Sequence, residues 1–215
     1  MKRVATRVAT RAMCATCLRA QSACICGWIR PVEAQAELLI LQHPLEVGNA
    51  KNSARLLHLC VRGSSMVVGE AFDGAELDGL LRAHGRTPVL LYPDTAGDQL
   101  LPTPPLMPAL PATSLRLVLL DATWRKSRKM LYLNPALQRL PRLALQEVAP
   151  SNYRIRKAHA QHQLSSLEAA ARALGQLEGS TEIEIQYAFE FVVEIMVMFC
   201  CGLCCDLPLC GVLGC

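Results

Sequence analysis

The stretch Leu117-Val-Leu-Leu-Asp-Ala-Thr-Trp-Arg-Lys-Ser-Arg-Lys-Met130 joins a short apolar run to a strongly basic segment. Val118, Leu119 and Leu120 are typical of a strand covered on both faces, as in parallel α/β sheets. Asp121 follows at the carboxyl end of this strand, where open α/β sheets bind their ligands. The stretch therefore predicts an α/β fold with a functional site at this edge of the sheet.

A basic helix is predicted to begin directly after this strand, with Thr123 in position to cap it. Arg125, Lys126, Arg128 and Lys129 place four cations within about one and a half helical turns, a density that suits a phosphate backbone. The ordinary alternative is a solvated helix face.

Strand-like and helix-like segments alternate along the rest of the chain, which favours a mostly parallel sheet. Further strands are predicted at residues 37–42, 66–68, 88–92 and 142–146, and helices at 75–83 and 164–174 with a stop at Gly175. Another helix carries Ala54, Leu56, Leu57 and Cys60 on its apolar side. Lys51 and Arg55 near its start suit a phosphate group.

The first cysteines are spaced as Cys14-x-x-Cys17 and Cys24-x-Cys26. Each pair lets a tight turn aim two thiolates at one ion, so the four predict a tetrahedral, structural zinc site with no open position for catalysis. The alternative is four reduced cysteines in an unstructured arm. All six charged residues of segment 1–32 are cations, which favours a polyanionic partner.

The compartment expected from these features is the cytoplasm. The chain has 11 cysteines but no apolar signal-peptide core near Met1, and metal-ligand spacing fits a reducing environment better than a disulfide framework. The arginine-rich start could instead be a short mitochondrial presequence.

Two further segments differ from the rest of the chain in composition. Residues 93–111 contain six prolines and predict a long loop, which is either a lid or rim of the site or a variable surface excursion. Residues 183–215 form an apolar, cysteine-rich tail. Its uninterrupted apolar run, 195–205, is about half the roughly 20 residues of a membrane span, so no membrane association is expected. A second metal site and an altered reading frame remain as explanations of the tail.

The motif Asp121-x-Thr123-Trp124 resembles the signature of the DTW-domain family of tRNA-uridine aminocarboxypropyltransferases. The cysteine pairs, the segment Asn52-Ser-Ala-Arg-Leu-Leu57, the segment Ser151-x-Tyr153-Arg-Ile-Arg-Lys157 and the segment Gln163-Leu-Ser-Ser-Leu-Glu-Ala169 resemble the family in order and spacing. The resemblance runs from about residue 14 to residue 175 and is expected to end near residue 182.

This resemblance implies a SPOUT-like α/β fold with a trefoil knot that holds S-adenosylmethionine. The chain is expected to divide into a basic zinc-binding arm (1–33), a catalytic domain (34–182) and an atypical tail (183–215). The implied reaction transfers the 3-amino-3-carboxypropyl group of S-adenosylmethionine to N3 of a tRNA uridine and releases methylthioadenosine. No stable protein partner is expected.

Residue roles follow from the resemblance and from the chemistry that each group can supply. Asp121 is the expected general base. The expected cofactor-binding residues are Leu91, Tyr92, Pro93, Asp94, Thr123, Trp124, Tyr153 and Arg156. The expected RNA-binding residues are Lys51, Arg55, Arg125, Lys126, Arg128, Lys129, Arg154 and Lys157.

Two other function classes remain open from the sequence. One is a SPOUT-type RNA methyltransferase, which uses the same cofactor with another product. The other is a non-catalytic RNA-binding protein. No GxGxxG, Walker or HExxH motif occurs, so a Rossmann methyltransferase, a kinase or a zinc protease is not supported.

Overall fold

The computed structural model describes residues 12–49, 52–93, 101–145 and 164–179. The strands are β1 (Glu37–Gln42), β2 (Ser65–Val68), β3 (Thr87–Leu91), β4 (Leu115–Asp121) and β5 (Arg142–Leu143). The α-helices are α1 (Ala54–Cys60), α2 (Gly74–Leu81), α3 (Trp124–Leu133), α4 (Pro135–Gln138) and α5 (Ser166–Glu178). Short 3-10 helices cover Gln21–Ala23, Cys26–Trp28, Pro44–Glu46, Ala83–Gly85 and Ala112–Ser114.

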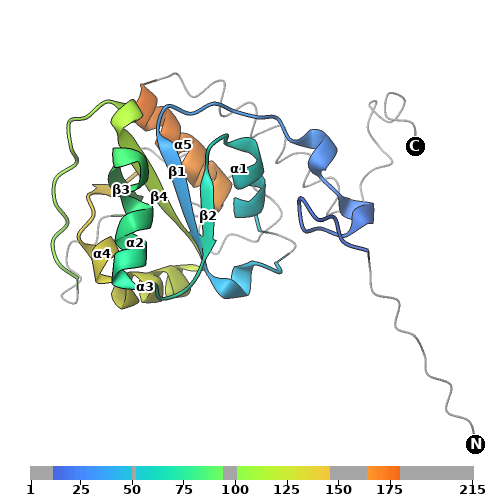
Figure 1. The fold of residues 1–215 in the computed structure, drawn as a ribbon, viewed down its shortest axis with the longest axis horizontal. Coiled ribbons are helices and arrows are strands. Elements are labelled where there is room, and N and C mark those ends of the chain that lie inside the picture. The colour runs from blue at the N-terminus through green and yellow to red at the C-terminus, as the bar shows by residue number, and fades with distance from the viewer. Residues whose placement is uncertain (1–11, 50–51, 94–100, 146–163, 180–215) are drawn as a thin grey trace, which may run out of the picture.

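The strands form one parallel sheet in the order β2-β1-β4-β3-β5, which confirms the predicted α/β class (Figure 1). β4 lies in the middle, and all of its residues are buried. This burial explains its nearly continuous apolar sequence, because helices cover both faces of the sheet. In the register of β1 and β4, Gln42 pairs with Asp121.

Alternate residues of each strand pack against different helices. In β1, Leu38 and Ile40 belong to a core shared with α1 and α5, whereas Leu39 and Leu41 belong to a core shared with α2, α3 and α4. Figure 1 shows α1 and α5 on one side of the sheet and α2, α3 and α4 on the other. The site therefore rests on a sheet that is fixed from both faces.

The chain leaves the central strands in opposite directions. From β1 it continues to β2 on one side, and from β4 it continues to β5 on the other. Such a change of direction opens a crevice at the carboxyl ends of the strands, where α/β proteins bind ligands. Asp121 lies at this point.

The structure corrects several predicted boundaries. β5 is limited to two residues among those described. Helix α5 does not stop at Gly175, which is buried inside the helix; it ends at Glu178, where Gly179 adopts a φ of 60°. Glycine takes this left-handed conformation without the cost that a Cβ imposes. Helix α4 was not predicted.

Other predicted features fall partly or wholly outside the described residues. The threading that would form a knot involves the chain between β5 and α5, of which residues 146–163 are not described. The same holds for the tail 183–215 and for residues 94–100 of the proline-rich loop. Within the described part of the chain, no helix is both long and apolar enough to span a membrane.

Candidate active site

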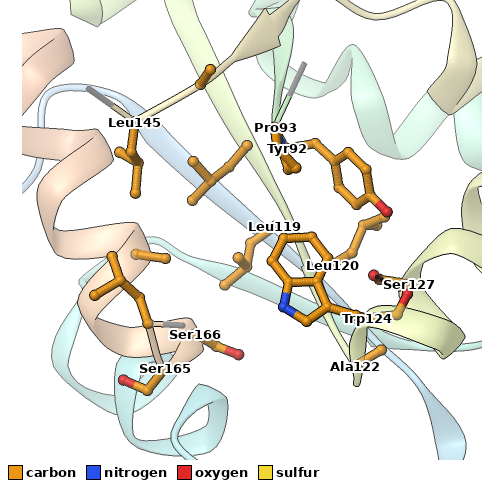
Figure 2. Close-up of a pocket in the computed structure, with 14 residues that line it drawn as sticks. Tyr92, Pro93, Leu119, Leu120, Ala122, Trp124, Ser127, Leu145, Ser165 and Ser166 are labelled. Carbon is orange, nitrogen blue, oxygen red and sulfur yellow. Dashed lines mark hydrogen bonds between the residues drawn. The ribbon is translucent and has the colours of Figure 1, made fainter. Parts of the chain in front are cut away.

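A cavity of about 280 Å³ opens where the carboxyl ends of β3, β4 and β5 meet helices α3 and α5 (Figure 2). This volume is at the small end of the range for small-molecule sites. Most of the lining is apolar. The lining residues are Leu91, Tyr92, Pro93, Leu119, Leu120, Ala122, Trp124, Ser127, Ala144, Leu145, Leu164, Ser165, Ser166 and Ala169.

An aromatic pair forms one side of the cavity. The rings of Tyr92 and Trp124 meet edge to face, with centroids 5.9 Å apart and an interplanar angle of 71°. Tyr92 is buried, whereas Trp124 is 54% exposed on the first turn of α3. An indole that is held by a neighbour yet open to solvent offers a flat face for stacking with a base.

Four of the cofactor-binding residues expected from the sequence line the cavity: Leu91, Tyr92, Pro93 and Trp124. Thr123 does not line it. It occupies the cap position of α3 without a side-chain capping hydrogen bond. Asp94, Tyr153 and Arg156 lie outside the described residues.

The opposite wall was not identified from the sequence as part of the site. It comes from the start of α5, where Leu164, Ser165, Ser166 and Ala169 line the cavity (Figure 2). These residues belong to the segment 163–169 that resembles the family, so a signal for them was present. Ser165 caps α5 by accepting a hydrogen bond from the backbone N–H of Glu168, whose carboxylate accepts one from the N–H of Ser165.

Asp121 is 3% exposed and does not line the cavity. Its Oδ2 accepts hydrogen bonds from Asn52 Nδ2 (2.6 Å) and Gln42 Nε2 (2.9 Å), and its Oδ1 accepts one from Ser166 Oγ (2.7 Å). The carboxylate thus joins the end of β1, the turn before α1 and the first residue of α5 to β4. A buried charge needs such partners.

The four cations of α3 are not equivalent. Lys126 Nζ contacts Glu46 Oε1 at 3.1 Å, and Lys129 Nζ contacts Glu70 Oε2 at 2.9 Å. Arg128 Nε donates to the hydroxyl of Tyr132, and its guanidinium lies over that ring. Arg125, Arg128 and Lys129 are exposed, whereas Lys126 is half-buried.

Glu70, which lies beside this helix, has two basic partners. Glu70 accepts from Lys129 and also contacts His43 Nε2 at 3.0 Å. The Lys129 ammonium and the His43 ring hold the pKa of Glu70 below its ordinary value. His43 is 5% exposed, and its Nδ1 accepts from the backbone N–H of Leu45, so both ring nitrogens have partners within the chain.

Arg55 has a contact that the sequence could not indicate. Its Nε and Nη2 both donate to the backbone carbonyl of Thr16, at 3.0 and 2.6 Å. Thr16 lies between Cys14 and Cys17, so this arginine ties helix α1 to the cysteine arm. The other cations expected to bind RNA, Lys51, Arg154 and Lys157, lie outside the described residues.

The four cysteines of the arm come together. Their sulfur atoms all lie within 4.8 Å of one another, with Cys14 and Cys26 3.6 Å apart and Cys17 and Cys24 3.8 Å apart. Zn–S bonds of about 2.3 Å at tetrahedral angles place sulfur atoms about 3.8 Å apart, so the cluster fits a four-thiolate ion site.

The environment of these thiols differs from one to the next. Backbone N–H groups of Cys17 and Thr16 lower the pKa of Cys14 to about 6. Burial, together with the neighbouring thiols, raises the pKa of Cys26 to about 12. Four thiolates this close repel one another, and a divalent cation would compensate their charge.

Known proteins resemble this chain over most of its length. A tRNA-uridine aminocarboxypropyltransferase 2 from Mus musculus is 31% identical over 182 residues, which cover 81% of this chain and 59% of the relative. The protein of the same name from Drosophila melanogaster is 33% identical, with 80% of this chain and 69% of the relative covered. That from Macaca fascicularis is 28% identical, with 81% and 59% covered.

The chain spans about three-fifths of the length of the two mammalian relatives. No solved structure matches it. The family model described as DTW domain matches residues 11–201, which extends past residue 182, where we expected the resemblance to end. The chain therefore belongs to the DTW-domain family.

Proposed function

We propose that this protein transfers the 3-amino-3-carboxypropyl group of S-adenosylmethionine to N3 of a uridine in tRNA and releases methylthioadenosine. The names of its relatives support the substrate and the group transferred. The observation that carries the proposal is the position of the cavity. It opens at the carboxyl edge of a parallel sheet, beside an exposed tryptophan on the first turn of the basic helix α3.

The donor, when bound, supplies a sulfonium that activates the carbon to be transferred. A bond forms between uridine N3 and that carbon, the bond from the carbon to sulfur breaks, and the electron pair stays on sulfur. The N3 proton leaves to a base. All three carbons on the sulfonium can be attacked, so the protein must select one by holding the donor in a fixed orientation.

The cavity supplies features that suit this orientation. Its apolar floor, formed by Leu119 and Leu120, excludes water, and the exposed face of Trp124 can stack on adenine or on an extruded uracil. Two polar side chains from the lining, Ser127 and Ser165, can orient polar groups of the donor. Asp94, Thr123, Tyr153 and Arg156 stay predicted cofactor ligands, with Arg156 as the partner of the donor carboxylate.

The tRNA would lie against the outer face of α3. Arg125 is the strongest candidate for a phosphate contact there, because it is exposed, whereas Lys126 and Lys129 are paired with carboxylates. Arg128 stays a predicted RNA ligand. Lys51, Arg154 and Lys157 stay predicted RNA ligands. The general-base role expected for Asp121 also stays a prediction.

We further propose a SPOUT-like knotted arrangement of the carboxyl-terminal part and a structural zinc on Cys14, Cys17, Cys24 and Cys26. The strand order and the sulfur distances support these two proposals. With four thiolates the ion has no open position, so it would stabilise the arm without entering the reaction.

The direct test is incubation of the purified protein with unmodified tRNA and S-adenosylmethionine, followed by mass spectrometry of the nucleosides and of the spent donor. We expect an aminocarboxypropyl uridine and an equal amount of methylthioadenosine. Methyl uridine with S-adenosylhomocysteine would show a methyltransferase, and binding of tRNA with no product would show a non-catalytic RNA-binding protein.

A matched pair of variants links the activity to the cavity. Trp124→Ala should weaken binding of the stacked base about 5- to 150-fold, because base stacking on an aromatic ring contributes about 1–3 kcal/mol. Trp124→Phe keeps a flat ring and should lose much less. Equal behaviour of the two variants would place the substrate elsewhere.

A further inference from the structure

The Asp121 carboxylate brings together three segments that are far apart in the sequence. Gln42 comes from the end of β1, Asn52 from the turn before α1, and Ser166 from the start of α5. Each donates a hydrogen bond to Asp121. The segments that contain Asn52, Asp121 and Ser166 are three of those that resemble the family, and hydrogen bonds to one carboxylate bring them together.

The orientation of Asn52 is fixed by the backbone. Its Oδ1 accepts from the N–H groups of Ala54 and Arg55, at 3.0 and 3.2 Å. Its amide NH₂ must therefore face Asp121 as a donor. The carboxylate meets donors on both oxygens, which is the arrangement of an anion that holds other groups in place.

Ser166 connects this carboxylate to the cavity. Its hydroxyl donates to Asp121 Oδ1, and the residue itself lines the cavity with Leu164, Ser165 and Ala169. A second contact lies nearby, because the backbone N–H of Leu167 donates to the hydroxyl of Ser53 at 3.4 Å. The start of α5 is thus attached to the sheet through side chains.

Trp124, on the other side of the cavity, follows Asp121 by three residues at the junction of β4 and α3. The bond between Ser166 and Asp121 therefore joins the α5 wall to the junction that carries Trp124.

We propose that Asp121 is a positioning residue that sets the width of the donor cavity by holding the start of α5 through Ser166. This inference rests on the proposed function only in taking the cavity as the donor site. It differs from the general-base role, because a base must reach the substrate. Asp121 does not line the cavity, and both of its carboxylate oxygens already accept hydrogen bonds from side chains of this chain.

Ser166→Ala gives the cleanest test, since it removes one hydroxyl and leaves the carboxylate in place. We expect the Kd and KM for S-adenosylmethionine to rise about tenfold, the scale of one hydrogen bond to a charged group, with kcat within about threefold of the wild type. Ser166→Thr retains a hydroxyl and should restore most of the affinity.

Ser64→Ala is the matched control. Ser64 also donates its hydroxyl to backbone carbonyls, those of His58 and Val61, but it lies between α1 and β2 and does not line the cavity. Its loss should lower the melting temperature without changing the Kd for the donor. A similar Kd for both alanine variants would overturn the proposal.

Asp121→Asn separates the two roles of the carboxylate. A positioning role predicts weakened donor binding and a pH–rate profile parallel to that of the wild type. A base role predicts normal donor binding, a large loss of kcat and a rate that climbs with pH as N3 ionises by itself. If Asp121→Asn does not fold, the comparison of Ser166→Ala with Ser166→Thr decides.

The proposed function and the positioning role can fail independently. If the wild-type protein binds the donor but transfers no aminocarboxypropyl group, the proposed function fails. In that case the binding constants of the Ser166 variants still test the positioning role.

Discussion

Lys126 and Arg125 are neighbours with the same charge, but their surroundings differ. The Lys126 ammonium pairs with Glu46, whose side chain is only 4% exposed, whereas Arg125 is exposed. Sequence alone groups the two as RNA ligands, because no local pattern shows that Glu46, 80 residues earlier, lies under the helix.

This difference leads to opposite effects of alanine. Arg125→Ala should reduce the salt slope of tRNA binding by about one unit and change stability by less than about 0.5 kcal/mol. Lys126→Ala should leave the slope nearly unchanged and destabilise the fold by about 1–3 kcal/mol, because the buried carboxylate of Glu46 loses its ammonium partner. Binding titrations at several salt concentrations and urea unfolding measure both effects. A slope that falls equally in both variants would show that Lys126 also reaches phosphate.

At the scale of elements, the cysteine arm is held by several contacts to the main domain. Cys14, Cys17 and Ile25 are buried in the core shared by α1 and α5, and Arg55 donates two hydrogen bonds to Thr16. The described part of the arm, residues 12–33, therefore packs against the main domain, in contrast to the alternative of an unstructured arm.

We expect Arg55→Ala to loosen the arm. The backbone N–H groups of residues 14–26 should exchange with deuterium faster, while α5 stays protected. Arg55→Lys should also loosen it, since lysine lacks the planar pair of N–H donors. Arg62 provides the control, because it forms only an exposed pair with Glu33. Exchange that does not differ between Arg55→Ala and Arg62→Ala would show that the arm is held by apolar contacts alone.

The predicted zinc site is tested by Cys14→Ser together with Cys17→Ser. We expect the wild-type protein to contain about one zinc per chain and the variant to lose it, because two serines cannot replace two thiolates. Elemental analysis of the purified proteins measures the content. We also expect the variant to bind tRNA more weakly, with little change in its affinity for S-adenosylmethionine. A wild-type protein without metal would contradict the predicted zinc site.

At the amino-terminal edge of the sheet, β1 and β4 are joined by a charged pair. Glu37 accepts from Arg116 at 2.8 and 3.0 Å, and Arg116 is 2% exposed. His84 and Arg86 also contact Glu37. Burial would raise the pKa of Glu37, but the hydrogen bonds from His84 and Arg116 outweigh it and hold the pKa below its ordinary value.

Glu37→Gln should therefore destabilise the protein in a pH-dependent way. A carboxyl with a lowered pKa in the folded state stabilises the fold above its unfolded pKa, and this contribution is lost as the pH falls through the folded value. We expect a loss on the order of 3 kcal/mol at neutral pH that shrinks below about pH 4. Unfolding free energies of the two proteins across pH measure it, and a constant difference would contradict the assignment.

At the scale of the whole molecule, the sequence predicted every strand of the described sheet and its parallel class. A strand that is covered on both faces is apolar along its length. Burial in the sheet therefore leaves an apolar run, such as 117–120, in the local sequence. The ends of the elements were harder to predict, as helix α5 shows, because it continues through Gly175. A glycine on the buried face of a helix and a glycine that ends one look alike until packing is known.

The candidate site likewise has parts with a local sequence pattern and parts that depend on packing. Leu91, Tyr92, Pro93 and Trp124 could be predicted because they follow strands whose carboxyl ends share one edge. Ser165 and Ser166 were not assigned to it, although their segment resembles the family, because their position depends on which helix begins over β4. That arrangement follows from the strand order, which no local pattern determines.

Analysis of the reaction products decides whether this protein transfers an aminocarboxypropyl group to a tRNA uridine. Purified wild-type protein, unmodified tRNA and S-adenosylmethionine should yield one methylthioadenosine for each aminocarboxypropyl uridine found by nucleoside mass spectrometry. Methyl uridine accompanied by S-adenosylhomocysteine, or tRNA that is bound but unchanged, would contradict the account.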